Sequence, residues 1–158
     1  MSLTTLVTRP VNRLRMDWAA TGAFPAPAAA DSARSRAMLH EARCPGRAAD
    51  AALVLADARA LPLASGRADA VFAAGLVTHL PDSQAGLGEL ARVTRRGGLL
   101  VLFHPSGRAA LAARHGRTLT PDEPLAAGPL RRLTSATGWE LTGYDDAEER
   151  FLALAVRR

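Results

Sequence analysis

The sequence contains no lysine, a single cysteine and few aromatic residues. All 20 basic residues are arginines, Cys44 is the only cysteine, and Phe, Trp and Tyr together make up 4% of the chain. A single cysteine excludes an intramolecular disulfide and a cysteine-based zinc site. We expect Cys44 to be a free, buried thiol that packs as a small apolar residue.

Long hydrophobic runs are absent as well. Apolar stretches such as Leu99 to Phe103 are far too short to cross a bilayer. The N-terminus lacks a charged start followed by an apolar run, which is the pattern of a secretory signal. We therefore expect a cytoplasmic protein without a membrane segment.

The net charge of +5 is compatible with an anionic partner. However, the arginines are spread along the chain, and the pairs Arg95-Arg96, Arg131-Arg132 and Arg157-Arg158 are short. A nucleic-acid site needs a clustered basic face and a recognisable motif. We therefore do not expect nucleic-acid binding; strongly salt-dependent binding would be its signature.

The length and composition indicate one globular domain. The chain has 158 residues, of which 48% are hydrophobic and 22% charged, and a domain of this size buries roughly 70% of the surface of its unfolded chain. Residues 23–30 are only alanine and proline apart from Phe24, which disfavours regular structure. The predicted organisation is an irregular segment over residues 1–30 and an α/β domain over residues 31–158.

Three apolar runs predict buried strands. They are Ala52–Ala56, Ala70–Ala74 and Leu99–Phe103, and none of them alternates polar with apolar residues, which is typical of parallel strands covered on both faces. Two helices are predicted, one over Ser32–Arg43 and one from Pro81-Asp82 to Gly97-Gly98. The second helix joins two of the strands and forms a crossover unit.

The C-terminal part predicts a helix over Pro124–Thr137, ended by Gly138, and two strands over Trp139–Tyr144 and Phe151–Val156. The connection between these strands is too short for a crossover helix, so they should be antiparallel neighbours. The predicted fold class is α/β: a Rossmann-like, mostly parallel sheet with helices on both faces and a C-terminal antiparallel strand pair.

Several spaced features of this chain form a recognisable pattern. They are Asp57, Leu61-Pro62, Gly66, Asp69, His79, Glu89, Arg92-Val93 and Gly97-Gly98, followed by the tail TGWELTGYDDAEERFLALAVRR. Over residues 35–158 the chain resembles class I S-adenosylmethionine-dependent methyltransferases, and more narrowly the branch that includes ubiquinone and small-metabolite methyltransferases. The resemblance implies S-adenosylmethionine as the cofactor.

The N-terminal part departs from that family pattern, in which the first strand ends in an acidic residue and a G-x-G-x-G loop. The nearest segment here, RMDWAATGAF, offers Asp17 and Gly22 but places Trp18 where a small residue is needed. Glycine serves at such positions because it allows close approach of the backbone to the ligand. We expect the first βα unit to be shortened or missing, so that the domain is N-terminally truncated or degenerate.

The resemblance implies a set of cofactor-binding residues. Asp57 would accept a hydrogen bond from the adenine amine beside the Ala58 backbone, and Gly75 and Leu76 would line the same crevice. Asp31 is the candidate for the ribose hydroxyls, and Gly22 is the remnant of the cofactor loop. The structural alternative is a turn aspartate for Asp57 and an ordinary strand-to-loop transition for Gly75 and Leu76.

Other polar residues are expected to be structural. Asp69 opens its strand, so it lies at the wrong edge of the sheet for a ligand. Glu89 and Arg92 are three residues apart on a helix. A local pair between them is worth only a few tenths of a kcal/mol, so we interpret them as a solvated or packing feature. Trp18 and Trp139 are more typical of a core than of a stacking platform.

The histidines suggest one general base and no metal site. His79 follows the loop on the cofactor side and is the candidate to deprotonate a methyl acceptor; its alternative is a partly buried structural histidine. His104 also follows a strand on that edge. His40 and His115 form no ligand spacing with carboxylates.

Two functions remain open at this point. The first is methyl transfer from S-adenosylmethionine to an unidentified small-molecule acceptor by direct displacement. The second is a non-catalytic pseudo-methyltransferase that acts as a regulatory or partner-binding subunit, which the missing glycine loop favours. A sheet edge left open by absent strands would pair with another chain, so a homodimer or a partner protein is expected.

Overall fold

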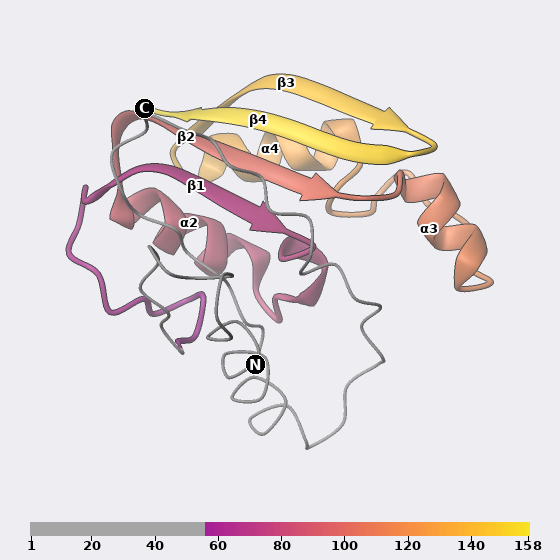
Figure 1. Cartoon of the computed structure of the whole chain (residues 1–158), viewed down its shortest axis with the longest axis horizontal. Coiled ribbons are helices and arrows are strands. Elements are labelled where there is room, and N and C mark those ends of the chain that lie inside the picture. The colour runs from indigo at the N-terminus through magenta and orange to yellow at the C-terminus, as the bar shows by residue number, and fades with distance from the viewer. Residues whose placement is uncertain (1–55) are drawn as a thin grey trace, which may run out of the picture.

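The described part of the chain is built around a four-stranded mixed sheet (Figure 1). The computed structural model describes residues 56–158. The strands are β1 (Ala68–Ala74), β2 (Thr94–His104), β3 (Trp139–Ala147) and β4 (Arg150–Arg157), in the spatial order β1-β2-β4-β3. β1 and β2 run parallel, whereas β4 is antiparallel to both β2 and β3. The predicted sheet with an antiparallel pair at its C-terminal end is confirmed.

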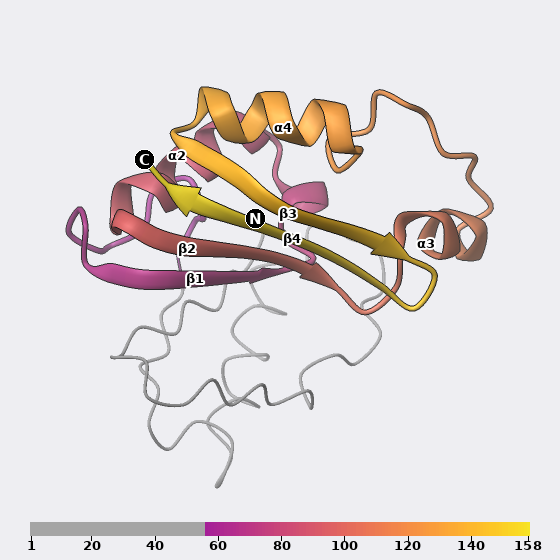
Figure 2. The ribbon, with the colours of Figure 1, turned by 90° about the horizontal axis from the view of Figure 1, so that it is seen from above.

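Helices α2 (Ser83–Val93) and α4 (Ala127–Ala136) lie together on one face of this sheet (Figure 2). The 3₁₀ turn η2 (Val77–His79) follows β1 and leads into α2. The short helix α3 (Arg108–Arg114), which the sequence pattern did not predict, lies beyond the end of β2. Parallel strands joined through α2 form the predicted crossover unit.

The core lies between the sheet and these two helices. Its largest fully buried side chains are contributed by both layers: Trp139, Phe151 and Leu100 from the sheet, and Leu87, Leu90 and Leu130 from the helices. The indole Nε1–H of Trp139 donates a hydrogen bond of 3.0 Å to the Leu87 carbonyl oxygen. A buried indole needs such a partner, so Trp139 is a core residue as predicted.

Helix α2 ends earlier than the sequence suggested. Its last residue is Val93, and Gly97-Gly98 lie inside β2 instead of ending the helix. Side chains satisfy the last carbonyl groups of the helix: Thr94 Oγ1 donates to Leu90 O at 2.7 Å, and Arg157 Nε donates to Ala91 O at 2.9 Å. Because these carbonyls already have partners, the helix does not require a glycine cap.

The two glycines instead shape an irregularity in the β1–β2 pairing. Ala68 pairs with Thr94 and Ala70 with Leu99, so β2 carries extra residues at this point. A Cβ on Gly98 would lie 2.6 Å from Thr94 Cγ2 and 2.8 Å from the Asp69 carbonyl oxygen. Only glycine permits such close approach of the two strands.

Helix α4 and the terminal hairpin agree closely with the predicted elements. α4 begins three residues later than predicted, because the Ala126 N–H closes a turn on the Glu123 carbonyl at 2.8 Å before the helix starts. Gly138 follows the helix with φ of +85°, which confirms it as the helix terminator. β3 begins at the predicted residue and continues three residues further, to Ala147. β4 is one residue longer than predicted at each end.

Several predictions fall outside the described residues. They are the irregular segment 1–30, the domain boundary at residue 31, the helix Ser32–Arg43, the strand Ala52–Ala56 except for its last residue, and the site candidates Gly22 and Asp31.

Two glycines should respond to alanine in opposite directions. A Cβ on Gly107 would overlap the Ala147 carbonyl oxygen, whereas one on Gly88 in α2 has no atom within 4 Å. We expect Gly107→Ala to lower the free energy of unfolding by about 1–3 kcal/mol. Gly88→Ala should raise it by roughly 0.5–1 kcal/mol, because alanine suits a helix interior better. Urea unfolding of both variants measures the difference, and equal effects would contradict the packing around Gly107.

Candidate functional site

The carboxyl ends of β1 and β2 meet at one edge of the sheet, which is where open α/β sheets bind ligands. Gly75 follows β1, and its N–H donates to the Phe103 carbonyl near the end of β2 at 2.8 Å. His104 ends β2, and its Cδ2 lies 3.9 Å from the position of a Cβ built on Gly75. Gly75 and His104 are therefore neighbours at this edge.

The backbone after β1 bends sharply at Gly75. Its φ is +62°, a left-handed conformation that costs other residues about 1–2 kcal/mol. Gly75 is half-buried, while the Leu76 side chain is 4% exposed and packs in the core. A ligand at this edge would therefore meet the backbone of Gly75 and Leu76, and not the Leu76 side chain.

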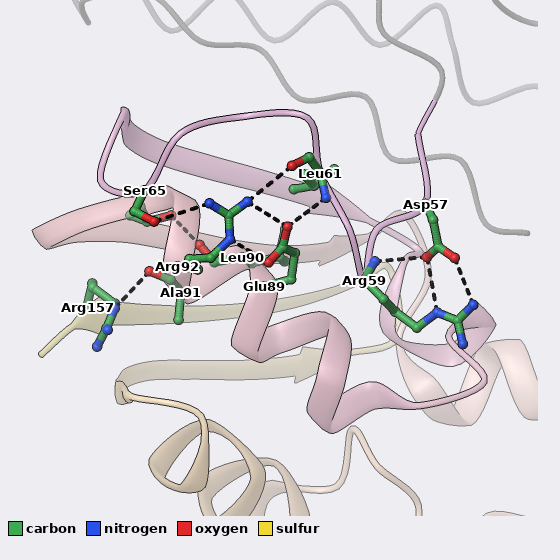
Figure 3. Close-up of polar contacts among 10 residues, drawn as sticks. Asp57, Arg59, Leu61, Ser65, Glu89, Leu90, Ala91, Arg92 and Arg157 are labelled. Atoms are coloured by element: carbon green, nitrogen blue, oxygen red, sulfur yellow. Dashed lines mark hydrogen bonds and ion pairs between the residues drawn. The ribbon is translucent and has the colours of Figure 1, made fainter.

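Asp57 and Ala58 form a tight turn before the loop that leads to β1. The Ala60 N–H donates to the Asp57 carbonyl at 2.9 Å, and Ala58 is 1% exposed. Figure 3 shows Asp57 and Arg59 on the side where α2 begins, whereas Arg92 and Ser65 lie on the side where the helix ends. Because β1 leads through η2 into the start of α2, this is also the side of the carboxyl end of β1. Asp57 and Ala58 are thus held at the same end of the sheet as Gly75.

The Asp57 carboxylate is bound by Arg59 (Figure 3). Oδ1 accepts from the Arg59 backbone N–H at 2.9 Å and from Nε at 3.1 Å, and Oδ2 accepts from Nη2 at 2.7 Å. The hydrogen bonds from the Arg59 side chain, and then the one from its backbone, lower the pKa of Asp57 to about 2. Asp57 is therefore a permanent anion and hydrogen-bond acceptor at physiological pH.

A network on α2 fixes the loop that follows this turn (Figure 3). Glu89 Oε1 accepts from the Leu61 N–H at 2.6 Å, and Glu89 Oε2 accepts from Arg92 Nε at 2.7 Å. Arg92 in turn donates to the Leu61 carbonyl at 3.1 Å and to Ser65 Oγ at 3.2 Å. The predicted pair between residues three apart is present, and Glu89 in addition joins the helix to a loop 28 residues earlier in the chain.

Removal of this network should destabilise the protein. The Glu89 side chain is 12% exposed, and Glu89→Ala would leave the Leu61 N–H and the Arg92 guanidinium without their partner. We expect a loss of about 1–3 kcal/mol at pH 7. Glu140→Ala is the matched control, because its 3.6 Å pair with Arg158 is exposed and should change stability by less than about 0.5 kcal/mol.

The effect of Glu89 should also depend on pH. Hydrogen bonding to Arg92, and secondarily to the Leu61 N–H, lowers the pKa of Glu89 below its ordinary value, while burial opposes the shift. The carboxylate therefore stabilises the fold fully above about pH 4.3, the unfolded glutamate value. This contribution is lost as pH falls through the lower folded-state pKa. Urea unfolding of wild type and Glu89→Ala should converge under acidic conditions, and a constant difference would contradict the ionic role.

Two histidines flank the ligand edge. His79 is exposed at the end of η2, and its backbone N–H donates to the Leu76 carbonyl at 3.0 Å. His104 is half-buried, with Nδ1 at 2.9 Å from the Ser106 carbonyl oxygen and at 3.1 Å from the Ser106 nitrogen. Either ring tautomer of His104 therefore finds a partner, and its ring orientation is fixed.

The opposite edge of the sheet contains Asp69. Its carboxylate accepts from Arg95 Nε at 2.6 Å, and both side chains are about half exposed. Asp69 lies at the start of β1, away from Gly75, as the sequence position predicted. Its role is an exposed ion pair that links the starts of two strands.

A second cluster near the ligand edge was not found from the sequence. Arg108 at the start of α3 lies 3.3 Å from Asp146 on β3 and 3.3 Å from Glu123 in the loop between α3 and α4. The Arg108 N–H also donates to Asp146 Oδ1 at 2.7 Å. These contacts tie α3 to the terminal hairpin. They join residues 15 to 38 positions apart, so a local sequence motif cannot predict them.

Two kinds of feature are absent from residues 56–158. This part of the chain holds no group of three or more His, Cys, Asp or Glu side chains placed to bind a metal ion. It also holds no helix long and apolar enough to cross a membrane.

Comparisons with known proteins point to one family. A family model described as "Methyltransferase domain" matches residues 18–102, more than half of the chain. No curated protein matches the chain.

Solved structures share the fold at low sequence identity. The complex between the Haloferax volcanii Trm112 methyltransferase activator and its methyltransferase partner gives a TM-score of 0.60 at 15% identity, covering 76% of this chain and 67% of that one. A methyltransferase of Methanosarcina mazei gives 0.55 at 16% identity, with coverages of 77% and 76%. One of Thermotoga maritima gives 0.60 at 15% identity, with coverages of 78% and 70%.

Proposed function

Because this chain belongs to the methyltransferase domain family, whose cofactor is S-adenosylmethionine, we propose that it transfers a methyl group from that cofactor to a small-molecule acceptor. The observation that supports the proposal is that Gly75 and His104 are neighbours at the ligand edge of the sheet, with the Asp57 turn on the same side. The chemistry of these groups fits the cofactor, since an ionised carboxylate accepts from the adenine amine and a glycine turn lets the backbone approach a ligand.

The bound cofactor supplies an electrophilic methyl group on a sulfonium. The residues of this chain bind and orient the reactants, which is how such an enzyme accelerates a direct displacement. Asp57 and the Ala58 backbone hold the adenine, while the backbone of Gly75 and Leu76 lines the crevice. The imidazole of His79 takes the proton that the acceptor loses. Asp31 and Gly22 remain candidates for the ribose and for the cofactor loop.

Transfer of labelled methyl groups tests the activity directly. The protein is incubated with methyl-labelled S-adenosylmethionine and a protein-free extract of small molecules. Label should appear in the small-molecule fraction with wild type and decline with Asp57→Ala and with His79→Ala. Absence of transfer by wild type, despite measurable cofactor binding, would favour the non-catalytic alternative.

That alternative, a partner-binding subunit, is supported by one observation. Phe72, Leu99 and Leu154 belong to three neighbouring strands and are 39%, 46% and 36% exposed. Large apolar side chains exposed together are typical of a protein interface. Light scattering of the purified protein measures whether it forms a dimer, and a strictly monomeric mass would argue against self-association.

A further inference from the structure

Asp57 and Arg59 are joined by three hydrogen bonds, whereas a single N–H···O contact is enough for a surface ion pair. Arg59 contributes one backbone and two side-chain N–H groups, all within 3.1 Å of the carboxylate oxygens. The fork of the guanidinium matches the geometry of a carboxylate and fixes its plane. Asp57 therefore has one defined orientation before any ligand arrives.

The same contact limits how a ligand can approach. An ionised carboxylate offers about four acceptor positions on its two oxygens. Arg59 occupies two positions on Oδ1 and one on Oδ2. The position left open is on Oδ2, so a single N–H donor, such as one hydrogen of an exocyclic amine, can be received there.

The backbone around this carboxylate is anchored on both sides. The Ala60 N–H closes the turn on the Asp57 carbonyl at 2.9 Å. Leu61, directly after the turn, is bound through its N–H to Glu89 at 2.6 Å and through its carbonyl to Arg92 at 3.1 Å. These bonds hold the backbone of the turn in place. The Asp57 carboxylate therefore has a fixed position as well as the orientation that Arg59 sets.

We propose that Arg59 is a positioning residue of the cofactor site: it holds the Asp57 carboxylate in one orientation so that the open position on Oδ2 receives the 6-amino group of the adenine. This inference rests on the proposed function, because it concerns the same site. Arg59 acts through Asp57 and does not itself carry the reaction. The role is specific to the residue two positions after the carboxylate, since that spacing lets backbone and side chain bind the same group.

The experiment measures binding of two ligands to three proteins by calorimetry. The ligands are S-adenosylhomocysteine and S-inosylhomocysteine, which has a 6-oxo group in place of the amine. The proteins are wild type, Arg59→Ala and the control Arg95→Ala. Arg95 forms the comparable exposed pair with Asp69, at 2.6 Å and at the opposite edge of the sheet.

Arg59→Ala should weaken S-adenosylhomocysteine binding about threefold to fivefold, the upper range for an exposed ion pair. Binding of the 6-oxo ligand should stay as in wild type, because it has no amine for Asp57 to receive. Arg95→Ala should bind both ligands as wild type does. The preference for the amino ligand would then fall by the same factor in Arg59→Ala alone.

A second readout needs no ligand. The Asp57 carboxyl carbon, followed by NMR from pH 6 down to pH 3.5, should stay unchanged in wild type, because its pKa is about 2. In Arg59→Ala the signal should begin to move in this range as the pKa approaches the ordinary value. The same titration in both proteins would overturn the inference.

The remaining outcomes are distinct from one another. Equal weakening of both ligands by Arg59→Ala, or no weakening of either, would overturn the positioning role while leaving the cofactor site intact. No binding of S-adenosylhomocysteine by wild type would overturn the proposed function, and the role of Arg59 would fall with it.

Discussion

S-adenosylmethionine, at 100 times its dissociation constant, is expected to raise the thermal unfolding midpoint of this protein by roughly 5–10 °C. A ligand that binds only the folded state stabilises it by about 2.7 kcal/mol at that concentration. For a domain of this size each kcal/mol corresponds to about 2–4 °C. The demethylated product, S-adenosylhomocysteine, should act similarly. Differential scanning calorimetry with and without each ligand measures both shifts.

Asp57→Ala should remove most of this shift, because the adenine amine loses its acceptor. Asp69→Ala is the matched control: it removes a carboxylate that also binds an arginine, but one that lies at the start of β1, at the opposite edge of the sheet. The shift should persist in that variant. A shift that survives in Asp57→Ala would show that the cofactor binds elsewhere, and no shift in wild type at millimolar ligand would contradict the enzymatic proposal.

Trp139→Ala is expected to lower the free energy of unfolding by about 3–5 kcal/mol, the largest stability effect that the structure predicts. The indole is fully buried between the sheet and the helices and is bonded to the Leu87 carbonyl. Alanine would leave a cavity where β3 meets the helix layer, and the surrounding core cannot close it completely. Urea unfolding followed by circular dichroism measures the loss.

Trp139→Phe separates packing from hydrogen bonding. Phenylalanine retains most of the apolar surface but cannot donate to Leu87 O, so we expect a loss of about 1–2 kcal/mol from the hydrogen bond and the smaller ring. If Trp139→Ala cost less than about 1 kcal/mol, Trp139 would not join the two layers as the structure indicates.

Much of the fold followed from local patterns. The apolar runs predicted β1 and β2, since buried parallel strands consist of short uninterrupted apolar segments. The short connection after Tyr144 required an antiparallel hairpin, because so few residues cannot cross over the sheet. Asp57 and Gly75 were predicted to lie at the ligand edge because each follows a predicted strand, and this prediction depends on chain direction alone.

Two of the arginines have structural roles that the sequence did not suggest. Arg92 binds a carboxylate, a carbonyl and a hydroxyl at once, and Arg157 donates to the carbonyls of Ala91 and Gly138. A planar group with five donors can join segments in this way, whereas an ammonium group is a compact point charge. Spread along the sequence, these residues resembled a weakly basic surface; in the fold they connect backbone segments.

The sequence by itself determined the strands β1 to β4, the helices α2 and α4, their order along the chain and the edge at which Gly75 lies. Only the tertiary structure decided where α2 ends, what Glu89 binds and how the Asp57 turn is anchored. The physical reason is distance along the chain. Periodicity and turn residues act over a few positions, whereas the contacts of Glu89 with Leu61 and of Arg157 with Ala91 join residues 28 and 66 positions apart. Such partners meet only after the sheet and its helices have packed together.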